Sequence, residues 1–260
     1  MKIKLYHIDA FTDFLFKGNP AAVCILDSWI DENKMQLIAM ENNLSETAFV
    51  VKKKNIYHIR WFTPISEVDL CGHATLASSF VIFKYLEIEN NLITFQSMNR
   101  GKLNVYKKGS YYTLDFPSDN ISNIKFPKLL TNSLNIEPIS VFEGKDDFLL
   151  IFDNQKEIES LEVNYNQINK CGKRGIIVSS PGNKVDFVSR FFDAQVLEED
   201  PVTGSAHTTL IPFWSKKLKK SKLTAKQLSK RGGFLRCEYL GDRVRITGNA
   251  IEYMKGEINI

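Results

Sequence analysis

The chain repeats itself once, and this repeat restricts its possible folds more than any other feature of the sequence. Each half contains a glycine that opens an apolar segment, then an Arg-Gly pair, then a glycine between two strand-like segments. The matched residues are Gly72 and Gly204, Arg100 and Arg231, and Gly109 and Gly241. Their offsets are 132, 131 and 132 residues. Three nearly equal offsets favour two similar halves over the alternative, in which glycines simply recur at turns, as in any protein of mixed helices and strands.

Within each half, strand-like segments surround one apolar helix. Residues typical of strands occupy 47–51, 57–62, 101–116 and 233–248, and apolar residues at helical spacing occupy 32–43. The segment after Gly72 is apolar on nearly every side, so this helix must be enclosed by protein. Its counterpart after Gly204 is also apolar, and Pro212 within it predicts a kink or a local adjustment. We therefore expect an α+β fold in which a central buried helix wrapped by mostly antiparallel strands occurs twice.

The stretch 117–127 is rich in Pro, Ser, Asp and Asn and is therefore the expected linker. We expect an N-terminal domain at 1–118 and a C-terminal domain at 119–260, with the option that the last strand returns to the first domain. Two packed halves leave a cleft between them, and ligand pockets favour such positions.

Composition and charge argue against several classes of protein. The net charge is only +4, and the lysine cluster at 216–222 has no interleaved aromatic residues, so it indicates a solvated helix face and not a nucleic-acid site. The four cysteines have no paired spacing, which argues against a disulfide framework and a metal site. The N-terminal segment alternates like a strand, and no window approaches the roughly twenty apolar residues of a membrane span. We expect a cytoplasmic protein with no nucleic-acid or membrane partner.

The starts of the two apolar helices are candidate anion sites. A helix start offers unpaired N–H groups and a partial positive charge, so starts at Gly72 and Gly204 that face one cleft would hold a carboxylate or an enolate-like oxygen. The alternative is that these glycines only let helix and strand pack closely, and the sequence alone does not separate the two.

Two carboxylates are candidate functional residues because of their positions in the sequence. Glu46 directly precedes an apolar strand, where burial would favour proton transfer, although an exposed loop acid is the ordinary reading of such a position. Asp200 closes an acidic turn just before the second helix start, where it would either be solvated or orient a substrate amine or hydroxyl.

The histidines fall into two groups. His7 and His58 lie in strand patterns and are expected to be structural. His73 lies in the first turn of a buried helix, where the helix dipole should lower its pKa and favour the neutral ring. His207, one turn into the second helix, is expected to be a packing residue.

The chain resembles the PhzF-like phenazine-biosynthesis family in four ordered motifs. These are 18–23 (GNPAAV), 44–49 (LSETAF), 62–75 (FTP followed by EVDLCGHAT) and 200–206 (DPVTGSA). The resemblance spans almost the whole chain and implies a fold similar to that of diaminopimelate epimerase, with two pseudo-symmetric halves that each hold a helix within a curved sheet, and a homodimer. The family's namesake isomerises a dihydro-hydroxyanthranilate without metal or coenzyme. The resemblance therefore implies a cofactor-free, biosynthetic isomerase acting on a small carboxylate-bearing metabolite.

The same resemblance implies roles for individual residues. Glu46 would be the acid/base that moves the proton, with His73 and Asp200 as the other catalytic residues. Substrate binding would fall to Asn19, Gly72, Gly204, Ser205, Ala206 and Arg231. For Arg231 a second interpretation stays open, because it would equally brace the hairpin, as its counterpart Arg100 would. A carboxyl group that moves a proton, with a cradle for the developing charge, is chemically sufficient for such a reaction.

Two other functions compete with this one. A two-thiol racemase or epimerase needs opposed cysteines, but Cys71 before Gly72 is matched by Thr203 before Gly204, so the second thiol is missing. A non-catalytic binding protein on the same fold would have no need for a poised acid at Glu46. A metal hydrolase is weaker still, since no His and carboxylate spacing of that kind occurs.

Overall fold

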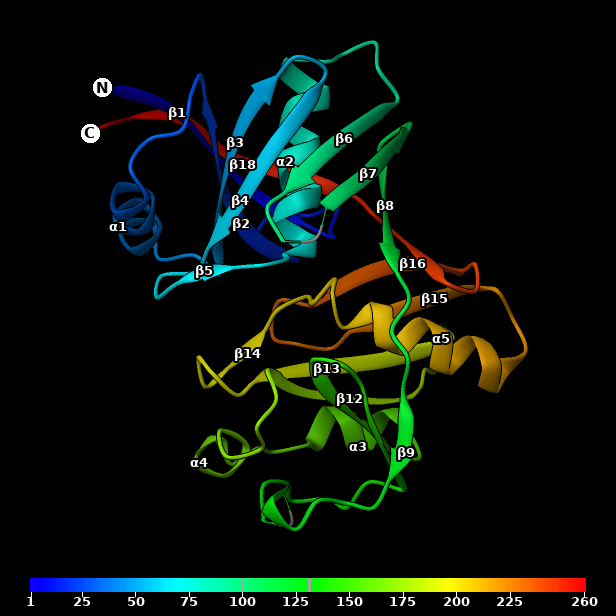
Figure 1. Ribbon diagram of the computed structural model, residues 1–260. Coiled ribbons are helices and arrows are strands. Elements are labelled where there is room, and N and C mark those ends of the chain that lie inside the picture. Colours follow the sequence, from blue (N-terminus) through cyan, green and yellow to red (C-terminus); the bar gives the residue numbers. More distant parts are fainter. Residues whose placement is uncertain (100, 131) are drawn as a thin grey trace. The chain divides into compact units, whose positions relative to one another are not determined.

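Figure 1 shows the computed structural model, which describes residues 1–99, 101–130 and 132–260. The chain divides into two compact units, each described by itself. Unit 1 comprises Met1–Asp115 and Thr247–Ile260, and unit 2 comprises Phe116–Ile246. The stretch expected to be a linker, 117–127, contains a short strand of unit 2.

Unit 1 is a mostly antiparallel sheet with two helical crossovers. Its strands are β1 (Lys2–Ala10), β2 (Asn19–Leu26), β3 (Glu46–Lys53), β4 (Ile56–Phe62), β5 (Glu67–Val68), β6 (Leu92–Ser97), β7 (Gly101–Lys108), β8 (Tyr111–Pro117) and β18 (Ala250–Asn259). Among the residues that the structure describes, its parallel pairs are β2 with β3 and β4 with β6. Parallel neighbours need a long crossover, and the helices α1 (Glu32–Asn42) and α2 (Gly72–Tyr85) supply it.

Unit 2 repeats this order. Its strands are β9 (Ser122–Ile124), β10 (Ser140–Glu143), β11 (Asp147–Ile151), β12 (Gly175–Pro181), β13 (Phe187–Asp193), β14 (Glu198–Asp200), β15 (Lys222–Gln227), β16 (Gly233–Tyr239) and β17 (Arg243–Gly248). Its parallel pairs are β11 with β12, joined through α3 (Gln155–Ser160) and α4 (Tyr165–Ile168), and β13 with β15, joined through α5 (His207–Leu218). A short 3₁₀ helix, η1, spans Lys128–Leu130.

The two central helices are buried, as their apolar sequences predict. In α2 most residues from Gly72 to Phe83 are buried, and the helix packs against β1, β2 and β3 (Figure 1). In α5, Leu210, Ile211 and Trp214 are fully buried, and the helix packs against β15 and β16. The predicted fold class, α+β with a buried helix and a mostly antiparallel sheet in each half, is confirmed.

The proline inside α5 has a structural consequence. Pro212 has no N–H group, so the carbonyl of Thr208, four residues earlier, receives no bond from it. That carbonyl instead accepts a hydrogen bond from the backbone N–H of Asp119, at 3.1 Å. The Asp119 carboxylate in turn accepts from Thr209 Oγ1 at 2.8 Å. The first segment of unit 2 is thereby attached to its own central helix.

The repeated glycines recur for a backbone reason. Gly109 and Gly241 lie between the strands of two hairpins with φ of +59° and +90°, and Gly101 and Gly232 have φ of +70° and +69°. Residues other than glycine rarely adopt backbone conformations with such positive φ angles. Arg100, the expected counterpart of Arg231, lies outside the described residues.

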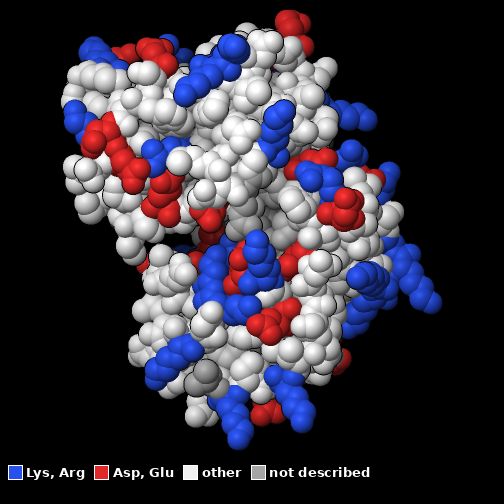
Figure 2. Space-filling view, viewed as in Figure 1, with Lys and Arg blue, Asp and Glu red and all other residues white. Residues whose placement is uncertain are grey.

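The surface agrees with a modest net charge. Basic and acidic side chains are interspersed over the face shown in Figure 2. The lysine cluster at 216–222 is not one helix face, because α5 ends at Leu218 and Lys219 takes a left-handed conformation beyond it. Among the described residues, no helix is long and apolar enough to span a membrane.

Candidate active site

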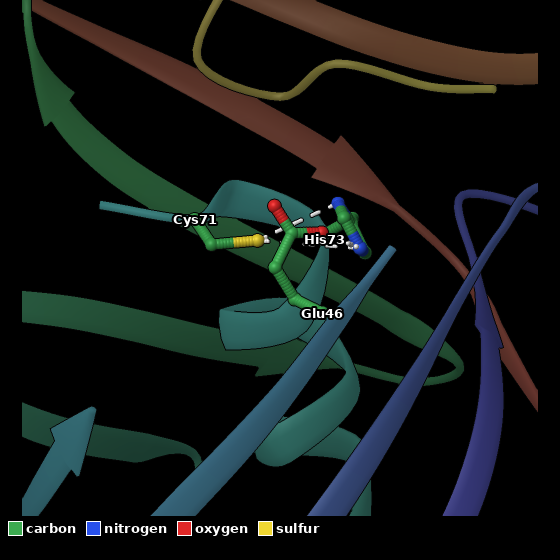
Figure 3. Close-up of side chains that lie close together, drawn as sticks. All are labelled: Glu46, Cys71 and His73. Atoms are coloured by element: carbon green, nitrogen blue, oxygen red, sulfur yellow. Dashed lines mark hydrogen bonds and ion pairs between the residues drawn. The ribbon is translucent and has the colours of Figure 1, made fainter. Parts of the chain in front are cut away.

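Three polar side chains meet at the starts of two strands and a helix in unit 1. β2 begins at Asn19 and β3 begins at Glu46, and these strands run parallel, with Ala21 opposite Glu46. His73 is the second residue of α2, so all three belong to neighbouring element starts. Glu46 Oε2 lies 3.0 Å from His73 Nε2, and Asn19 Nδ2 lies 3.0 Å from His73 Nδ1 (Figure 3 shows the Glu46 contact). The imidazole is thus held between a carboxylate and an amide.

Burial distinguishes the two ionisable members of this pair. The His73 side chain is only 4% exposed, whereas the Glu46 side chain is 18% exposed. Glu46 is therefore the more accessible member of the pair, and His73 is the more deeply buried one. The structure brings together Asn19, Glu46 and His73, three residues that the sequence had indicated, next to Gly72.

The expected pKa of His73 is wrong in direction. Burial alone lowers the pKa of His73, but the neighbouring Cys71 and the Glu46 carboxylate raise it, and the net result is a pKa well above the usual value. The helix start had predicted a lowered pKa. It does not decide the outcome because the carboxylate is 3.0 Å away.

Cys71 lies beside the histidine, with its Sγ atom 3.5 Å from His73 Nδ1 (Figure 3). Burial, together with the charge of Glu46, raises the pKa of Cys71 to about 11. The thiol is therefore protonated at neutral pH and is a poor nucleophile. This disfavours a thiolate mechanism independently of the missing second cysteine.

Glu46, Cys71 and His73 are also a possible metal-ligand set. Their ligand atoms lie within 4.8 Å of one another, and zinc accepts carboxylate, thiolate and imidazole ligands. Metal binding would require a deprotonated Cys71, and the raised pKa of that thiol opposes it. The geometry suits a proton-transfer pair better.

The helix start of unit 2 contains a charged contact that sequence reasoning missed. Arg174 NH1 donates a hydrogen bond to Ser205 Oγ at 2.7 Å. The same guanidinium donates through Nε to Asp147 Oδ1 at 2.9 Å and through NH2 to Asp147 Oδ2. Burial alone lowers the pKa of Arg174, and the adjacent Asp147 more than offsets this, so the guanidinium stays charged. A sequence signal existed, since Arg174 directly precedes an apolar strand, just as Ser45 directly precedes the strand that begins at Glu46.

Asp200 belongs to a separate polar network in the same unit. Thr203 Oγ1 donates to Asp200 Oδ2, and Gln227 Nε2 donates to the Asp200 carbonyl at 2.7 Å. The backbone N–H of Thr203 donates to Gln227 Oε1 at 2.8 Å. This network fixes the turn that leads to Gly204, Ser205 and Ala206. Arg231 lies in the turn before β16, and its role stays a prediction.

His207 is a packing residue, as expected. Its Nδ1–H donates to the Thr203 carbonyl at 2.9 Å, and its ring lies 6.0 Å from that of Phe187. Burial lowers the pKa of His207 to about 4. The ring is therefore neutral at physiological pH.

Comparison with known proteins gives consistent similarities over the whole chain. A family model described as "Phenazine biosynthesis-like protein" matches residues 8–256. A protein of Pseudomonas aeruginosa named an uncharacterized isomerase is 42% identical, with 100% of each chain covered. Another so named, from Halalkalibacterium halodurans, is 43% identical, with 99% of each covered. These findings confirm the predicted family resemblance, and the names agree with the predicted enzyme class, an isomerase.

Solved structures show the same likeness. The crystal structure of a PhzF family protein from Enterococcus faecalis has a TM-score of 0.95 and 43% identity, with 100% of each chain covered. A hydroxyproline epimerase from Agrobacterium vitis has a TM-score of 0.68 at 10% identity, covering 99% of this chain and 92% of that one. The second likeness concerns the fold alone.

Proposed function

Because this chain belongs to the PhzF phenazine biosynthesis-like family, we propose that it is an isomerase that moves a proton within a small carboxylate-bearing metabolite. The observation that carries the proposal is the Glu46 and His73 pair, in which a partly accessible carboxyl group lies 3.0 Å from a buried imidazole. General acid/base catalysis needs one such group that both takes and returns a proton.

The proposed reaction has two proton steps. The Glu46 carboxylate takes a proton from a carbon of an unsaturated acid, and the electron pair of that C–H bond spreads over the conjugated system to the carboxylate oxygens. The Glu46 carboxylic acid then returns the proton to a different carbon, and the double bonds move. The overall change is an isomerisation, in which no oxidant or reductant takes part.

His73 supports the carboxyl group in this scheme. Its pKa is raised by Cys71 and Glu46, and its Nε2 atom lies 3.0 Å from Glu46 Oε2, so the ring orients the carboxyl group. Asn19, on the other ring nitrogen, fixes the orientation of the imidazole. Removal of either residue would misplace or destabilise the base without removing it.

The two helix starts would bind the charge that develops on the substrate. We propose that backbone N–H groups at Gly72 in unit 1, and at Gly204, Ser205 and Ala206 in unit 2, hold the carboxylate or the enolate-like oxygen. Asp200 would orient a substrate amine or hydroxyl, and Arg231 would add a contact to an acidic group. A carboxylate-bearing substrate suits donors of this kind.

The test begins with a ligand screen. Small unsaturated carboxylic acids are tested by thermal shift, because a ligand at a hundredfold its dissociation constant adds about 2.7 kcal/mol to the free energy of unfolding. Ligands found in this way are incubated with the protein in heavy water, and exchange of their carbon-bound hydrogen is followed by NMR.

Glu46→Gln should bind such a ligand normally and lose at least about a hundredfold of the exchange rate, because glutamine keeps the shape and removes the acid. Cys71→Ser changes the same cluster and serves as the matched control, which should retain exchange. Normal binding with near-parental exchange in Glu46→Gln would refute the mechanism and make Asp200 or His73 the leading proton carrier.

A further inference from the structure

Arg174 contacts the helix start of unit 2 and is itself firmly held. Asp147 binds the guanidinium through two hydrogen bonds, and the Asp147 side chain is only 3% exposed. The guanidinium carbon also lies 5.0 Å from the centroid of the Phe191 ring. With these contacts on two sides, the third hydrogen bond, to Ser205, has a fixed direction.

That bond determines what the Ser205 hydroxyl can do. A guanidinium has donors and no acceptor, so in the bond from Arg174 NH1 the Ser205 oxygen must accept. The hydroxyl proton is then available, and no acceptor for it occurs among the described residues. Arg174 therefore converts an ambivalent hydroxyl into a hydrogen-bond donor.

The neighbouring backbone provides donors as well. The carbonyls of Gly204, Ser205 and Ala206 accept bonds from the first turns of α5. The N–H groups of Ser205 and Ala206 have no acceptor within the part of the chain that the structure describes. Such groups at a helix start attract negative charge.

We infer that Arg174 is a positioning residue that fixes the Ser205 hydroxyl as a donor to an oxyanion of the substrate. The inference rests on the proposed function in one respect, the binding of substrate by residues 204–206. The ligand chemistry is a carboxylate or another planar oxyanion, because two N–H groups and one O–H donor match oxygens that only accept. Arg174 acts through Ser205 and does not contact the reacting atoms.

The experiment uses benzoate as the probe and benzamide, its neutral analogue, as the control ligand. Both are titrated into ¹⁵N-labelled full-length protein, and the amide shifts of Ser205 and Ala206 are followed. In the parent protein benzoate should move these amides and benzamide should not. Arg174→Lys should weaken benzoate binding about tenfold, the scale of one charge-assisted hydrogen bond, because lysine cannot bind Asp147 at two points and also reach Ser205.

The matched control is Arg190→Lys. Arg190 also holds a carboxylate at two points, with Nε to Glu199 Oε1 at 2.7 Å and NH2 to Glu199 Oε2 at 3.0 Å, but its remaining bonds go to the Ile158 and Leu161 carbonyls. Arg190→Lys should lower the stability of the protein about as much as Arg174→Lys does, but its affinity for benzoate should stay at the parental value. Equal weakening by both substitutions would show a general structural effect and would overturn the inference.

A double-variant cycle separates positioning from direct binding. Ser205→Ala alone should weaken benzoate binding about tenfold. The double variant, Arg174→Lys with Ser205→Ala, should bind benzoate no more weakly than either single variant, because both substitutions remove the same hydrogen bond from Ser205 to the anion. Additive losses would mean that Arg174 binds the anion itself. If Arg174→Lys does not fold, Arg174→Gln with Asp147→Asn, which removes both charges together, takes its place.

The remaining outcomes are equally decisive. Parental affinity in Arg174→Lys, with benzoate still moving the 205 and 206 amides, overturns the role of Arg174 and leaves the proposed function intact. If benzoate does not move these amides in the parent protein, the proposed substrate contact of residues 204–206 fails as well.

Discussion

The two units place polar side chains at matching positions, and the side chains differ in kind. In unit 1 Asn19 begins β2, Glu46 begins β3 and His73 follows the glycine that starts α2. In unit 2 Asp147 begins β11, Arg174 precedes β12, and Ser205 follows the matching glycine. Both sets are linked by hydrogen bonds or ion pairs within their own unit. The framework is shared, whereas the chemistry at its strand ends is not.

The clusters differ in the kind of ionisable group that they hold. In unit 1 a carboxylate faces an imidazole whose pKa is raised. In unit 2 the guanidinium stays charged, and the serine hydroxyl does not titrate in the accessible range. The repeated fold thus holds a carboxylate and imidazole pair in one unit and a guanidinium charge in the other.

The largest expected effect in this comparison of the two units is on the free energy of unfolding. Arg174→Met leaves the buried Asp147 carboxylate without its partner and should lower the free energy of unfolding by about 3–5 kcal/mol, as measured by urea denaturation. Arg60→Met in unit 1 is the control. Its partners Glu32 and Glu67 are partly exposed, so its loss should be about 1 kcal/mol or less. If Arg174→Met lowered the free energy of unfolding by less than about 1 kcal/mol, the Arg174 and Asp147 pair would not be a rigid, stabilising contact of unit 2.

The second test uses the pH dependence of stability. Burial lowers the pKa of His207 to about 4, below the unfolded value near 6.5, so its contribution is present above pH 6.5 and is lost as the pH falls toward 4. The full loss is about 3 kcal/mol. His207→Asn, which can still donate to the Thr203 carbonyl, should have a flatter stability profile between pH 6.5 and 4. An unchanged profile would assign the acid sensitivity to other groups.

His73 should show the opposite sign. Its pKa is raised, so its contribution to stability is complete below pH 6.5 and is lost as the pH rises through the raised pKa. Cys71 and the Glu46 carboxylate both raise that pKa against the effect of burial. In Glu46→Gln one of these contributions is lost, so the His73 pKa should fall. An NMR titration of the ring measures this, and an unchanged pKa would contradict the pairing.

The smallest expected effect concerns thiol reactivity. Burial raises the pKa of Cys24 to about 12, and burial with the charge of Glu46 raises that of Cys71 to about 11, whereas Cys171 is only half-buried. Iodoacetamide should therefore alkylate Cys71 at least about tenfold more slowly than Cys171, as read by mass spectrometry of peptides. Rapid labelling of Cys71 would indicate a thiolate paired with His73 and would reopen a thiol mechanism.

The sequence predicted what depends on local pattern. The two central helices were predictable because their residues are apolar on all sides, and the repeat was predictable because turns with positive φ require glycine at Gly101, Gly109, Gly232 and Gly241. Glu46 and His73 were named because each lies at the start of an element within a recognisable motif.

The sequence did not predict what depends on pairing between distant segments. Arg174 and Asp147 meet because β11 and β12 run parallel, with Asp147 opposite Gly175, and no local pattern encodes that register. The direction of the His73 pKa shift was missed for the same reason. Its carboxylate partner comes from a different strand, while the helix dipole was visible in the local sequence.

The pairing of β18 with β1 has a consequence for how the chain is made. Along β1, residues Lys2 to Ala10 lie opposite β18 residues Asn259 to Ala250, so this edge of β1 is paired only after unit 2, which lies between the two strands in the chain, has been synthesised. Unit 2 is continuous in sequence and can close while unit 1 still lacks an edge. Throughout synthesis β1 therefore exposes unpaired backbone that could pair with another nascent chain. The waiting time, and with it the exposure to such mispairing, is set by the time needed to translate unit 2.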